Sequence, residues 1–381
     1  MRVLFISGLS GRPECGGTPT VLRRIGAELE RNGHRVEHWF AEDFPPLLAQ
    51  GSRATVTLPP AILTRLSRAG EYDVLDISSG DGVLYLGLHR LGLLRRARAV
   101  VVRSHGSEHL FGDMMRQAES EGLLNTSAVF RARFYGVRLR QVGWSLRLCD
   151  RVICCSHREP DLLAQRLRIP REKFTTIPHG VGEEFRNAPP PAESQRPQVI
   201  FAGNWVWNKG TRFLGPVFRE VRRKYPAAKF VVAGAHVPAD LVRAELPEEI
   251  RPALEVFRDL SPADLARKMA ESSLMLFPSD FEGFGLVAME AMALGVPVVM
   301  SRNVGLADWF NGDAPAAVVS HTLADYTQAC LRLLADDNAR RRLGQKARTW
   351  ASAFTWKVAA GRTLEAYQMA MEGKGGSEKC R

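Results

Sequence analysis

A strand, loop, helix and strand pattern that occurs twice constrains the fold of this chain most. Residues 2–40 contain the apolar run RVLFIS, a loop rich in glycine, a segment with helical spacing and the run HRVEHWF. Residues 198–234 repeat this order with QVIFAGN, a helical segment over 210–225 and KFVVAG. A buried strand followed by a crossover helix is the unit of a doubly wound parallel sheet. We therefore expect an α/β protein with two Rossmann-like domains.

Further apolar runs extend both sheets. The additional predicted strands lie at 72–78, 99–105, 151–156, 254–260 and 274–279. Two helix starts are also predicted: Thr18 as N-cap with Pro19 in the first turn, and Ser261 as N-cap with Pro262. Helical segments are expected from about 322 to 372.

A proline-rich segment separates the two halves. RNAPPPAESQRP at 186–197 carries too few apolar residues to form a core and is typical of a linker. A chain of 381 residues is also longer than one hydrophobic core usually supports. We predict one domain over 1–188 and a second over 197–357. Ligands of open α/β sheets bind at the carboxyl ends of the strands, so the chemistry is expected in a cleft shared by these ends.

The composition limits the function classes. The net charge of +11 favours an anionic partner such as a phosphorylated ligand, an acidic lipid surface or nucleic acid. No apolar run is long enough to span a bilayer and the first residues do not resemble a signal peptide, so a cytoplasmic location is expected. Six cysteines without zinc-ligand spacing are interpreted as free thiols: Cys15, Cys149, Cys154, Cys155, Cys330 and Cys380.

Two glutamates flank a glycine-rich turn in FPSDFEGFGLVAMEAMALG. Gly283 and Gly285 allow a tight turn after the strand, and a helix is expected to begin near Gly285 or Leu286. Unpaired N–H groups at such a helix start attract anions, above all phosphate. An isolated pair of glutamates is more often merely solvated. The nearly uncharged helix around Glu290 favours a binding site, with Glu282 on the loop.

At these residues the chain resembles the retaining glycosyltransferases of family four, a group with the GT-B fold that includes bacterial glycogen synthases and phosphatidylinositol mannosyltransferases. The pattern of Glu, seven residues and Glu carries the resemblance. Four further segments are similar to landmarks of that family in the same order: CGGTPT at 15–20, RSHGSEH at 103–109, IPHGV at 177–181 and FAGNWVWNKG at 201–210. The resemblance implies that the final helix crosses back, so that 358–381 pack on the first domain.

The resemblance implies a hexosyltransferase that moves a sugar from a nucleoside-diphosphate sugar to a hydroxyl acceptor, in polysaccharide, glycolipid or small-molecule glycosylation. A diphosphate leaving group needs positive charge and backbone donors, which Lys209 and the N–H groups near Phe284 supply. Glu290 would accept from the ribose hydroxyls and Glu282 from hydroxyls of the sugar. The expected catalytic residues are His105, Lys209 and Glu282. The expected donor-binding residues are Gly16, Gly17, Asn204, Lys209, Gly210, Arg258, Gly283, Phe284, Gly285, Leu286 and Glu290.

His105 ends the predicted strand 99–105 and would lie at the sugar-binding edge of the first domain. A histidine in such a place is more often structural, and the family resemblance supports a role in orienting donor and acceptor. The family transfers sugars with retention, usually explained by attack on the face from which the phosphate departs, so we name no side-chain base. We expect no metal and no cofactor, because SSGDG around Asp81 has one aspartate and is not a DxD motif.

The sequence departs from the family at Asn204, where arginine is usual. Asparagine donates hydrogen bonds without supplying charge. Either Arg212 or Arg258 substitutes for the missing cation, or the diphosphate site is weaker.

Residues 130–151 form a basic segment with aromatic side chains. Arg133, Arg140 and Arg147 are spaced by seven, and Arg131 and Arg138 lie beside them. On one helix they would form a single strip, which could lie on an anionic membrane surface near a lipid-linked acceptor. A packed helix with a solvated basic face is equally compatible. Nucleic acid is not expected, because no recognised binding motif accompanies the charge.

Two other functions stay open. A sugar-nucleotide epimerase shares the fold and needs no acceptor, and a binding protein on an inactive transferase fold would keep nucleotide affinity without turnover. A dehydrogenase is disfavoured, since the first loop GLSGRPECGG is not GxGxxG.

Overall fold

The computed structural model describes residues 1–11, 17–49, 51–189 and 196–373, which form two compact units. The first comprises Met1–His179 and Trp356–Arg381, and the second Gly180–Thr355. The chain therefore passes between the units at positions 180 and 356, where the sequence predicted 188–197 and 358. Val181 N–H donates to the Phe354 carbonyl at 3.0 Å, so the two passing segments are bonded to each other inside the second unit.

The first unit contains one parallel sheet in the order β2-β1-β3-β4-β5-β6. Its strands are β1 Arg2–Ile6, β2 Arg35–Trp39, β3 Tyr72–Ser78, β4 Ala97–Arg103, β5 Arg151–Cys154 and β6 Phe174–Thr176. Its helices are α1 Gly17–Arg31, α2 Pro46–Ala49, α3 Ala54–Arg68, α4 Val83–Arg90, α5 Glu108–Ser120, α6 Ala128–Arg131, α7 Leu139–Leu148, α8 Arg158–Leu167 and α16 Trp356–Glu372, with the π-helix η4 Ala132–Arg138 and the 3-10 helices η2 Ala41–Asp43, η3 Gly51–Arg53 and η5 Arg171–Lys173.

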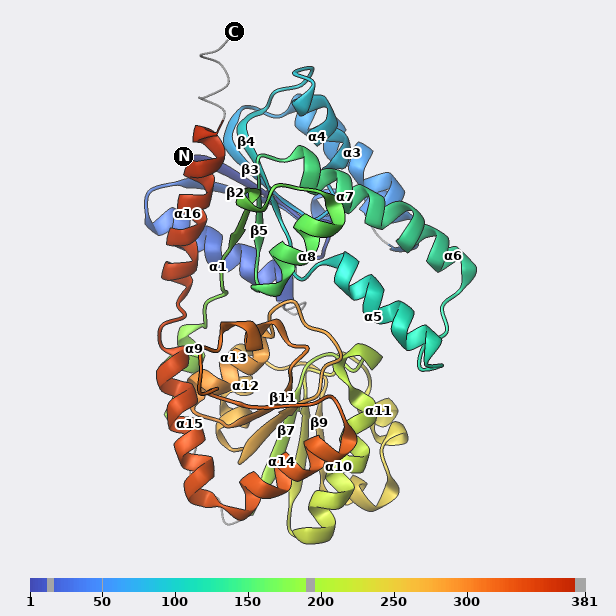
Figure 1. Cartoon of the computed structure of the whole chain (residues 1–381), viewed down its shortest axis with the longest axis vertical. Coiled ribbons are helices and arrows are strands. Elements are labelled where there is room, and N and C mark those ends of the chain that lie inside the picture. Colours follow the sequence, from blue (N-terminus) through green and yellow to red (C-terminus); the bar gives the residue numbers. More distant parts are fainter. Residues whose placement is uncertain (12–16, 50, 190–195, 374–381) are drawn as a thin grey trace. The chain divides into compact units, whose positions relative to one another are not determined.

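Helices cover both faces of this sheet. Figure 1 shows α1 and α16 on one side of it and α3, α4 and α7 on the other. Val3–Ile6 of β1 and Val74–Ile77 of β3 are buried, with Leu4, Ile6, Leu75 and Ile77 in one continuous core. Because both faces are covered, these strands carry apolar residues toward both faces, and Asp76 of β3 is the buried exception in the two stretches.

The second unit contains a parallel sheet in the order β12-β11-β10-β7-β8-β9. Its strands are β7 Gln198–Ala202, β8 Lys229–Ala233, β9 Leu254–Phe257, β10 Leu274–Phe277, β11 Val298–Ser301 and β12 Ala317–Val319. Its helices are α9 Glu183–Arg186, α10 Thr211–Lys224, α11 Ala239–Glu245, α12 Pro262–Ala270, α13 Leu286–Leu294, α14 Leu323–Ala335 and α15 Asp337–Ala351, with the 3-10 helices η6 Trp207–Lys209, η7 Glu248–Ala253 and η8 Gly305–Trp309.

In this unit α12 and α13 lie on one face of the sheet, and α10 and α14 on the other (Figure 1). The strand order changes direction between β7 and β10, because the chain adds β8 and β9 on one side of β7 and β10 on its other side. Such a switch point is where ligands of open α/β sheets bind. It brings the loop after β7 next to the loop after β10.

The sequence-predicted strands are present, within a few residues at their ends, and the α/β prediction is confirmed. The N-cap at Ser261 is confirmed, since its side chain accepts from Asp264 N–H. The N-cap at Thr18 is wrong, because α1 already begins at Gly17. Gly17 has φ of +56°, a conformation that glycine adopts without strain. The helix therefore starts one residue before the hydroxyl that was expected to cap it.

Candidate functional site

Lys209 and Glu282 meet at the switch point of the second sheet. Lys209 ends η6 in the loop after β7, and Glu282 lies in the loop after β10. Lys209 Nζ donates to Glu282 Oε1, which also accepts from Ser279 Oγ at 3.1 Å. Both side chains are mostly buried, at 22% and 14% exposed. The two charges that the sequence placed 73 residues apart are thus one ion pair.

Two glycines permit this approach of the loops. Gly210 has φ of +68°, and a Cβ built there would lie 1.9 Å from the Pro278 carbonyl oxygen. Gly285 has φ of +100°, and its Cβ would lie 2.6 Å from Val304 Cγ1. Both positions exclude side chains by conformation and by space. Gly210 is the N-cap of α10 and Gly285 is the N-cap of α13, so each helix starts beside the ion pair.

A second polar group adjoins this site. Asp280 accepts two hydrogen bonds from Arg212, at 2.7 and 2.5 Å, and one from His321 Nε2 at 2.8 Å. His321 Nδ1 is 2.7 Å from Tyr326 Oη. Burial alone would raise the pKa of Asp280, but the bonds from Arg212 and His321 outweigh it and lower the pKa. Arg212, a candidate to replace the missing family arginine, is therefore engaged by an ionised carboxylate.

The remaining predicted donor residues lie on three loops or helix starts of this unit. Asn204 is exposed just after β7, and Phe284 is buried just before α13. Glu290 lies on α13, one turn beyond Leu286, and is partly exposed. Arg258 is exposed directly after β9 and pairs with the neighbouring Asp259 at 3.4 Å. Since β9 is two strands from β7, about 10 Å separates the positions where these strands end.

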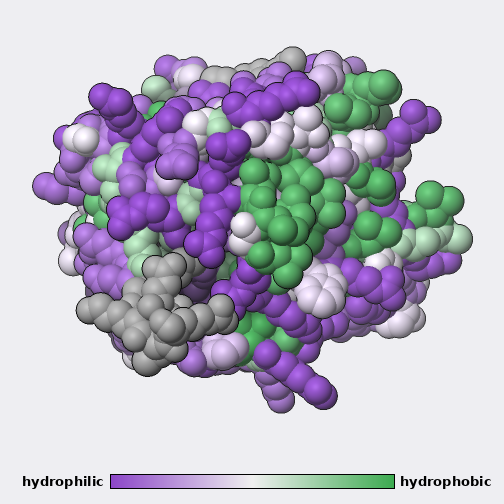
Figure 2. Space-filling model, turned by 90° about the horizontal axis from the view of Figure 1, so that it is seen from above, coloured by the Kyte–Doolittle hydropathy of each residue, from purple (hydrophilic) through white to green (hydrophobic). Residues whose placement is uncertain are grey.

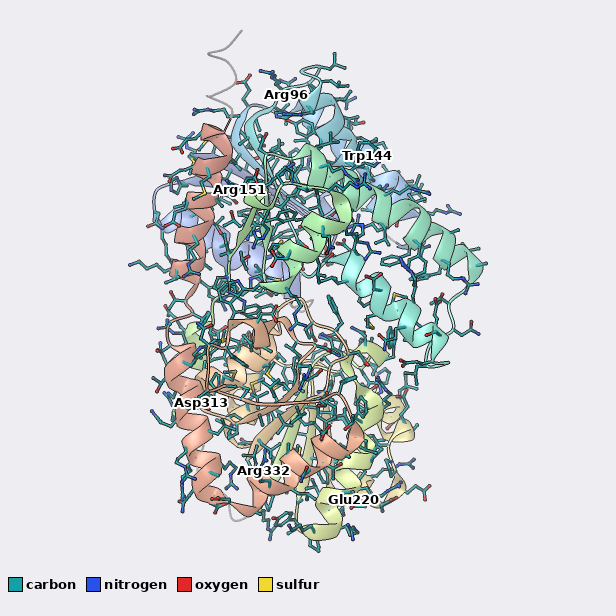
Figure 3. All side chains as sticks on the ribbon, in the orientation of Figure 1. Arg96, Trp144, Arg151, Glu220, Asp313 and Arg332 are labelled. Carbon is teal, nitrogen blue, oxygen red and sulfur yellow. The ribbon has the colours of Figure 1, made fainter. Side chains whose placement is uncertain are left out.

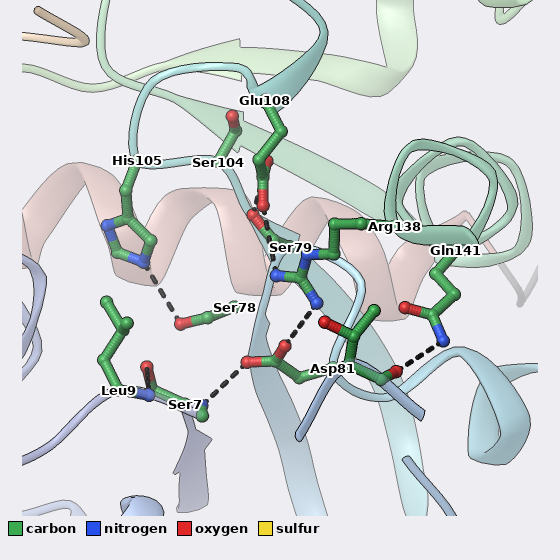
Figure 4. Close-up of polar contacts among 12 residues, drawn as sticks. Ser7, Leu9, Ser78, Ser79, Asp81, Ser104, His105, Glu108, Arg138 and Gln141 are labelled. Carbon is green, nitrogen blue, oxygen red and sulfur yellow. Dashed lines mark hydrogen bonds and ion pairs between the residues drawn. The ribbon is translucent and has the colours of Figure 1, made fainter. Parts of the chain in front are cut away.

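The first unit carries a polar cluster at the carboxyl ends of β1, β3 and β4 (Figure 4). Asp81 accepts from Gly8 N–H and from Arg138 Nη1, each at 2.7 Å. Glu108 accepts from Arg138 Nη2 at 3.1 Å and from Ser79 Oγ at 2.9 Å. Arg138 thus joins two carboxylates, and they raise its pKa although burial opposes the charge.

His105 lies at the edge of this cluster, and its Nε2 is 3.2 Å from Ser78 Oγ (Figure 4). Burial, Arg103 and His179 all lower the pKa of His105 far below its ordinary value. Burial also lowers the pKa of His179 to about 3. Both imidazoles are therefore neutral at physiological pH. His105 can exchange hydrogen bonds with a hydroxyl but offers no positive charge.

A buried carboxyl is bonded to Ser104, the residue before this histidine. Glu159 is fully buried, and Ser104 Oγ donates to its Oε1. Burial raises the pKa of Glu159 to about 7, although the bond from Ser104 lowers it. Sequence reasoning did not single out this residue, because it stands beside charged neighbours in HREPD on a helix that reads as amphipathic.

The cluster of Asp81, Glu108 and Arg138 was also not assigned from the sequence. Asp81 was noted only as a lone aspartate, although both acids follow the carboxyl end of a strand, which is a usable signal. Arg138 was placed on a basic strip with Arg131, Arg133, Arg140 and Arg147, and this is wrong for Arg138. Arg138 is two residues from Arg140, so the two side chains do not share a helix face. At the end of the π-helix η4, Arg138 donates to Asp81 instead.

Three further sequence expectations concern Gly16 and Gly17, a metal site and a membrane-spanning helix. Gly16 lies outside the described residues, whereas Gly17 is the first residue of α1. Within the described part of the chain, no group of three or more His, Cys, Asp or Glu side chains could hold a metal. Among the same residues, no helix has the length and apolarity required to cross a membrane.

Two family models match the chain. The model described as "Glycosyltransferase Family 4" matches residues 15–185, and the model described as "Glycosyl transferases group 1" matches residues 196–336. One relative is a glycogen synthase of Mycobacterium tuberculosis, 26% identical over 63% of this chain and 60% of its own length. A D-inositol 3-phosphate glycosyltransferase of Corynebacterium kroppenstedtii is 30% identical over 48% of this chain. The matched region thus covers 60% of the length of the first relative and 42% of the length of the second.

One relative aligns over nearly its full length, the MMP alpha-(1->4)-mannosyltransferase of Mycolicibacterium hassiacum, at 24% identity over 97% of this chain and 98% of its own. Among solved structures, a sucrose-phosphate synthase of Thermosynechococcus elongatus superposes with a TM-score of 0.76 at 19% identity, covering 98% of this chain and 99% of its own. This likeness shows the GT-B fold. With matches to both family models, one in each unit, the chain belongs to the family-four type of glycosyltransferases.

Proposed function

We propose that the protein is a retaining glycosyltransferase that moves a sugar from a nucleoside-diphosphate sugar to a hydroxyl acceptor, without a metal ion. The meeting of Lys209 and Glu282 at the switch point, beside the first turn of α13, carries this proposal. A cation and helix N–H groups suit a diphosphate, and a carboxylate suits sugar hydroxyls. The donor-binding residues inferred from the sequence remain predictions.

In this reaction Lys209 balances the charge that develops on the leaving diphosphate. Its pairing with Glu282 holds the ammonium group in place before the donor arrives, and a sugar hydroxyl then shares the carboxylate. The bond between the anomeric carbon and the phosphate oxygen breaks, and its electron pair leaves with the diphosphate. The acceptor oxygen bonds the same face of that carbon. Its proton passes to a leaving phosphate oxygen.

On the acceptor side we propose that His105 orients hydroxyl groups. Its neutral imidazole can donate or accept a hydrogen bond, whereas an imidazolium can only donate. Asp81 and Glu108 are further candidates to accept from acceptor hydroxyls. Their charges are shared with Arg138, which leaves the three side chains with a net charge of about −1 and favours a neutral, hydroxyl-rich acceptor.

A screen of nucleotides by thermal unfolding tests the donor site, because a ligand of the folded state raises the melting temperature. The probes are UDP, GDP, ADP, TDP and CMP. UDP is measured first, since an Anabaena protein of the same fold was solved with UDP-glucose, at 16% identity and a TM-score of 0.66. We expect one nucleoside diphosphate to stabilise the protein, by about 2.7 kcal/mol at a hundred times its Kd.

The shift should shrink in Lys209→Ala and Glu290→Ala. It should persist in Glu220→Ala, which removes a surface carboxylate of α10 in the same unit. No shift with any of the five nucleotides would contradict the proposed donor site.

Product analysis then separates the remaining functions. A transferase forms a glycoside only when an acceptor is present, whereas an epimerase changes the sugar without one. An inactive binding protein shows the thermal shift and no product. Proton NMR of the anomeric centre tests retention, and turnover in excess EDTA tests independence from metals.

We also propose that residues 130–151 contribute to contact with an anionic membrane surface. The exposed side of this segment carries Val137, Trp144 and Arg147. These types are typical of the membrane interface. A cytoplasmic location remains a prediction.

A further inference from the structure

The helix α4 of the first unit is apolar on two opposite sides. Tyr85, Leu86 and His89 face the core and are buried. Leu84, Leu88 and Leu91 follow a spacing of four and three residues and form the outer stripe. Leu84 is 44% exposed and Leu91 is 73% exposed. A surface helix of a globular protein usually carries polar residues on this side.

The loop after α4 continues the stripe and adds positive charge. Leu93 is 71% exposed, and Arg90 and Arg95 beside it are also exposed. We call these six residues the Leu–Arg face: Leu84, Leu88, Leu91, Leu93, Arg90 and Arg95. Figure 2 looks onto the end of the unit that carries α4 and shows a hydrophobic patch bordered by hydrophilic side chains. Contiguous apolar surface with a polar border is typical of interaction sites.

No negative charge within this part of the chain offsets the arginines. Residues 82–107 contain five arginines and no acidic residue. Of the five, Arg103 is buried against Asp76 inside the unit, and Arg98 shares its charge with Asp73 at 3.5 Å. Arg96 donates to the Ser67 carbonyl at 2.7 Å, and the exposed Arg90 and Arg95 place positive charge beside the leucines.

We propose that the Leu–Arg face binds an anionic lipid bilayer. The leucines would enter the boundary between headgroups and acyl chains, and the arginines would contact lipid phosphates. Trp144, 55% exposed on α7, lies on a helix that packs against α4 (Figure 3). Tryptophan is enriched at this depth of a membrane.

The arginines and the last two leucines of the Leu–Arg face lie at the opposite edge of the sheet from the polar cluster of Asp81, His105 and Glu108. The loop 91–96 leads into the first residue of β4, so it lies at the amino edge of the parallel strands. Asp81, His105 and Glu108 follow β3 and β4 and lie at the carboxyl edge. A bilayer that contacts Leu91, Leu93, Arg90 and Arg95 would therefore leave the cluster uncovered, and Leu84 at the start of α4 is the member of the face nearest to the cluster.

Two other occupants fit less well. A second copy of this chain would bring two arginine-rich faces together, and like charges across an interface are costly. Nucleic acid could pair its phosphates with the arginines, but it would leave the four leucines without apolar contacts. Binding to a phosphate backbone depends on charge and gains nothing from exposed leucines.

This surface lies outside the segment 130–151 except at Trp144, and it extends the proposed membrane contact to α4. It does not depend on sugar transfer. Binding to vesicles is measured without nucleotide or acceptor, so failure here leaves the donor site untouched, and the nucleotide screen can fail while the protein still binds lipid.

The test is sedimentation of the full chain with vesicles of phosphatidylcholine and phosphatidylglycerol, compared with vesicles of phosphatidylcholine alone. Leu91→Gln with Leu93→Gln is the test variant. Leu47→Gln with Leu241→Gln is the matched control, because Leu47 is 73% and Leu241 is 56% exposed, outside the face. Arg90→Gln with Arg95→Gln tests the charge. Thermal unfolding confirms that all three double variants fold.

We expect binding to the anionic vesicles only, weakened about tenfold or more in the leucine variant and kept in the control. The arginine variant should also bind more weakly, and salt well above about 0.15 M should reduce binding of the natural chain. Equal loss in the control variant, or absence of binding by the natural chain, would overturn the proposal. So would a dimer in sedimentation equilibrium that the leucine variant dissociates, because the face would then be covered by a second copy.

Discussion

Gly210 occupies a position in which a side chain meets both strain and collision. Its φ is +68°, and a Cβ there would lie 1.9 Å from the carbonyl oxygen of Pro278. Pro278 belongs to the loop that carries Glu282, so this contact sets the distance between the loops after β7 and β10. The glycine after Lys209 is thus required for the ion pair.

Replacing Gly210 with alanine should lower the free energy of unfolding by about 3 kcal/mol or more, since the backbone must move to admit the Cβ. Gly312→Ala is the matched control in the same unit, because Gly312 has φ of +72° with no atom within 4 Å of its Cβ. It should lose only about 1 to 2 kcal/mol from the left-handed backbone. Urea unfolding measures both, and equal losses would contradict the collision.

Glu159, which accepts from Ser104, makes the stability of the first unit depend on pH. Its carboxyl has an ordinary value of 4.5 in the unfolded chain and a pKa of about 7 in the folded state, where burial raises it. Between these values the folded protein binds one proton more than the unfolded chain. The contribution of Glu159 to stability is therefore greatest below about pH 4.5 and is lost as the pH rises through 7.

We predict that Glu159→Gln removes this loss. The difference in unfolding free energy between variant and natural chain should change by about 3 kcal/mol from pH 4.5 to pH 8, at about 1.36 kcal/mol per pKa unit. The exposed Glu172→Gln should show no such change. The comparison is made as a difference because His179, whose pKa is lowered to about 3, acts in the opposite direction. If the unfolding free energy of Glu159→Gln depended on pH in the same way as that of the natural chain, the raised pKa of Glu159 would be contradicted.

At the scale of elements, the strands were the most predictable part of the chain. Strands covered on both faces are mostly apolar, and the run YDVLDIS coincides with β3 from end to end although it includes the buried Asp76. The segment 130–151 was less predictable. A spacing of seven assumes an unbroken α-helix, but η4 is a π-helix between α6 and α7. Residues two or five positions apart do not share a helix face, so Arg138 could not lie on one strip with Arg133 and Arg140. At the end of η4 its guanidinium pairs with Asp81 and Glu108 instead.

For the whole molecule, the last helix completes the first unit. Tyr367 on α16 donates to Asp76 on β3 at 2.7 Å, and Asp76 also accepts from Arg103 on β4 at 2.6 Å. All three side chains are buried. The bond joins residues 291 positions apart and fixes the C-terminal helix to the N-terminal sheet. The packing of α16 on α1, β4 and β5 agrees with the expected return of the chain.

Tyr367→Phe should therefore destabilise the first unit by about 2 kcal/mol, since a buried carboxylate loses a donor and retains only Arg103. Tyr225→Phe, at a partly exposed position of the second unit, should change stability by less than about 0.5 kcal/mol. Differential scanning calorimetry measures both. If the two variants lose the same amount, the buried bond contributes little.

The sequence by itself determined the α/β class and the two sheets, because buried parallel strands and tight glycine turns leave local patterns, and the donor-side residues stay a prediction. It placed Lys209 and Glu282 in the right loops. Tertiary structure alone decided that they form an ion pair, since the strand order sets which loops are neighbours. It also decided the bonds of Arg138 and Tyr367. Their partners lie far away in the chain, and only the packed sheet and helices bring these charges together.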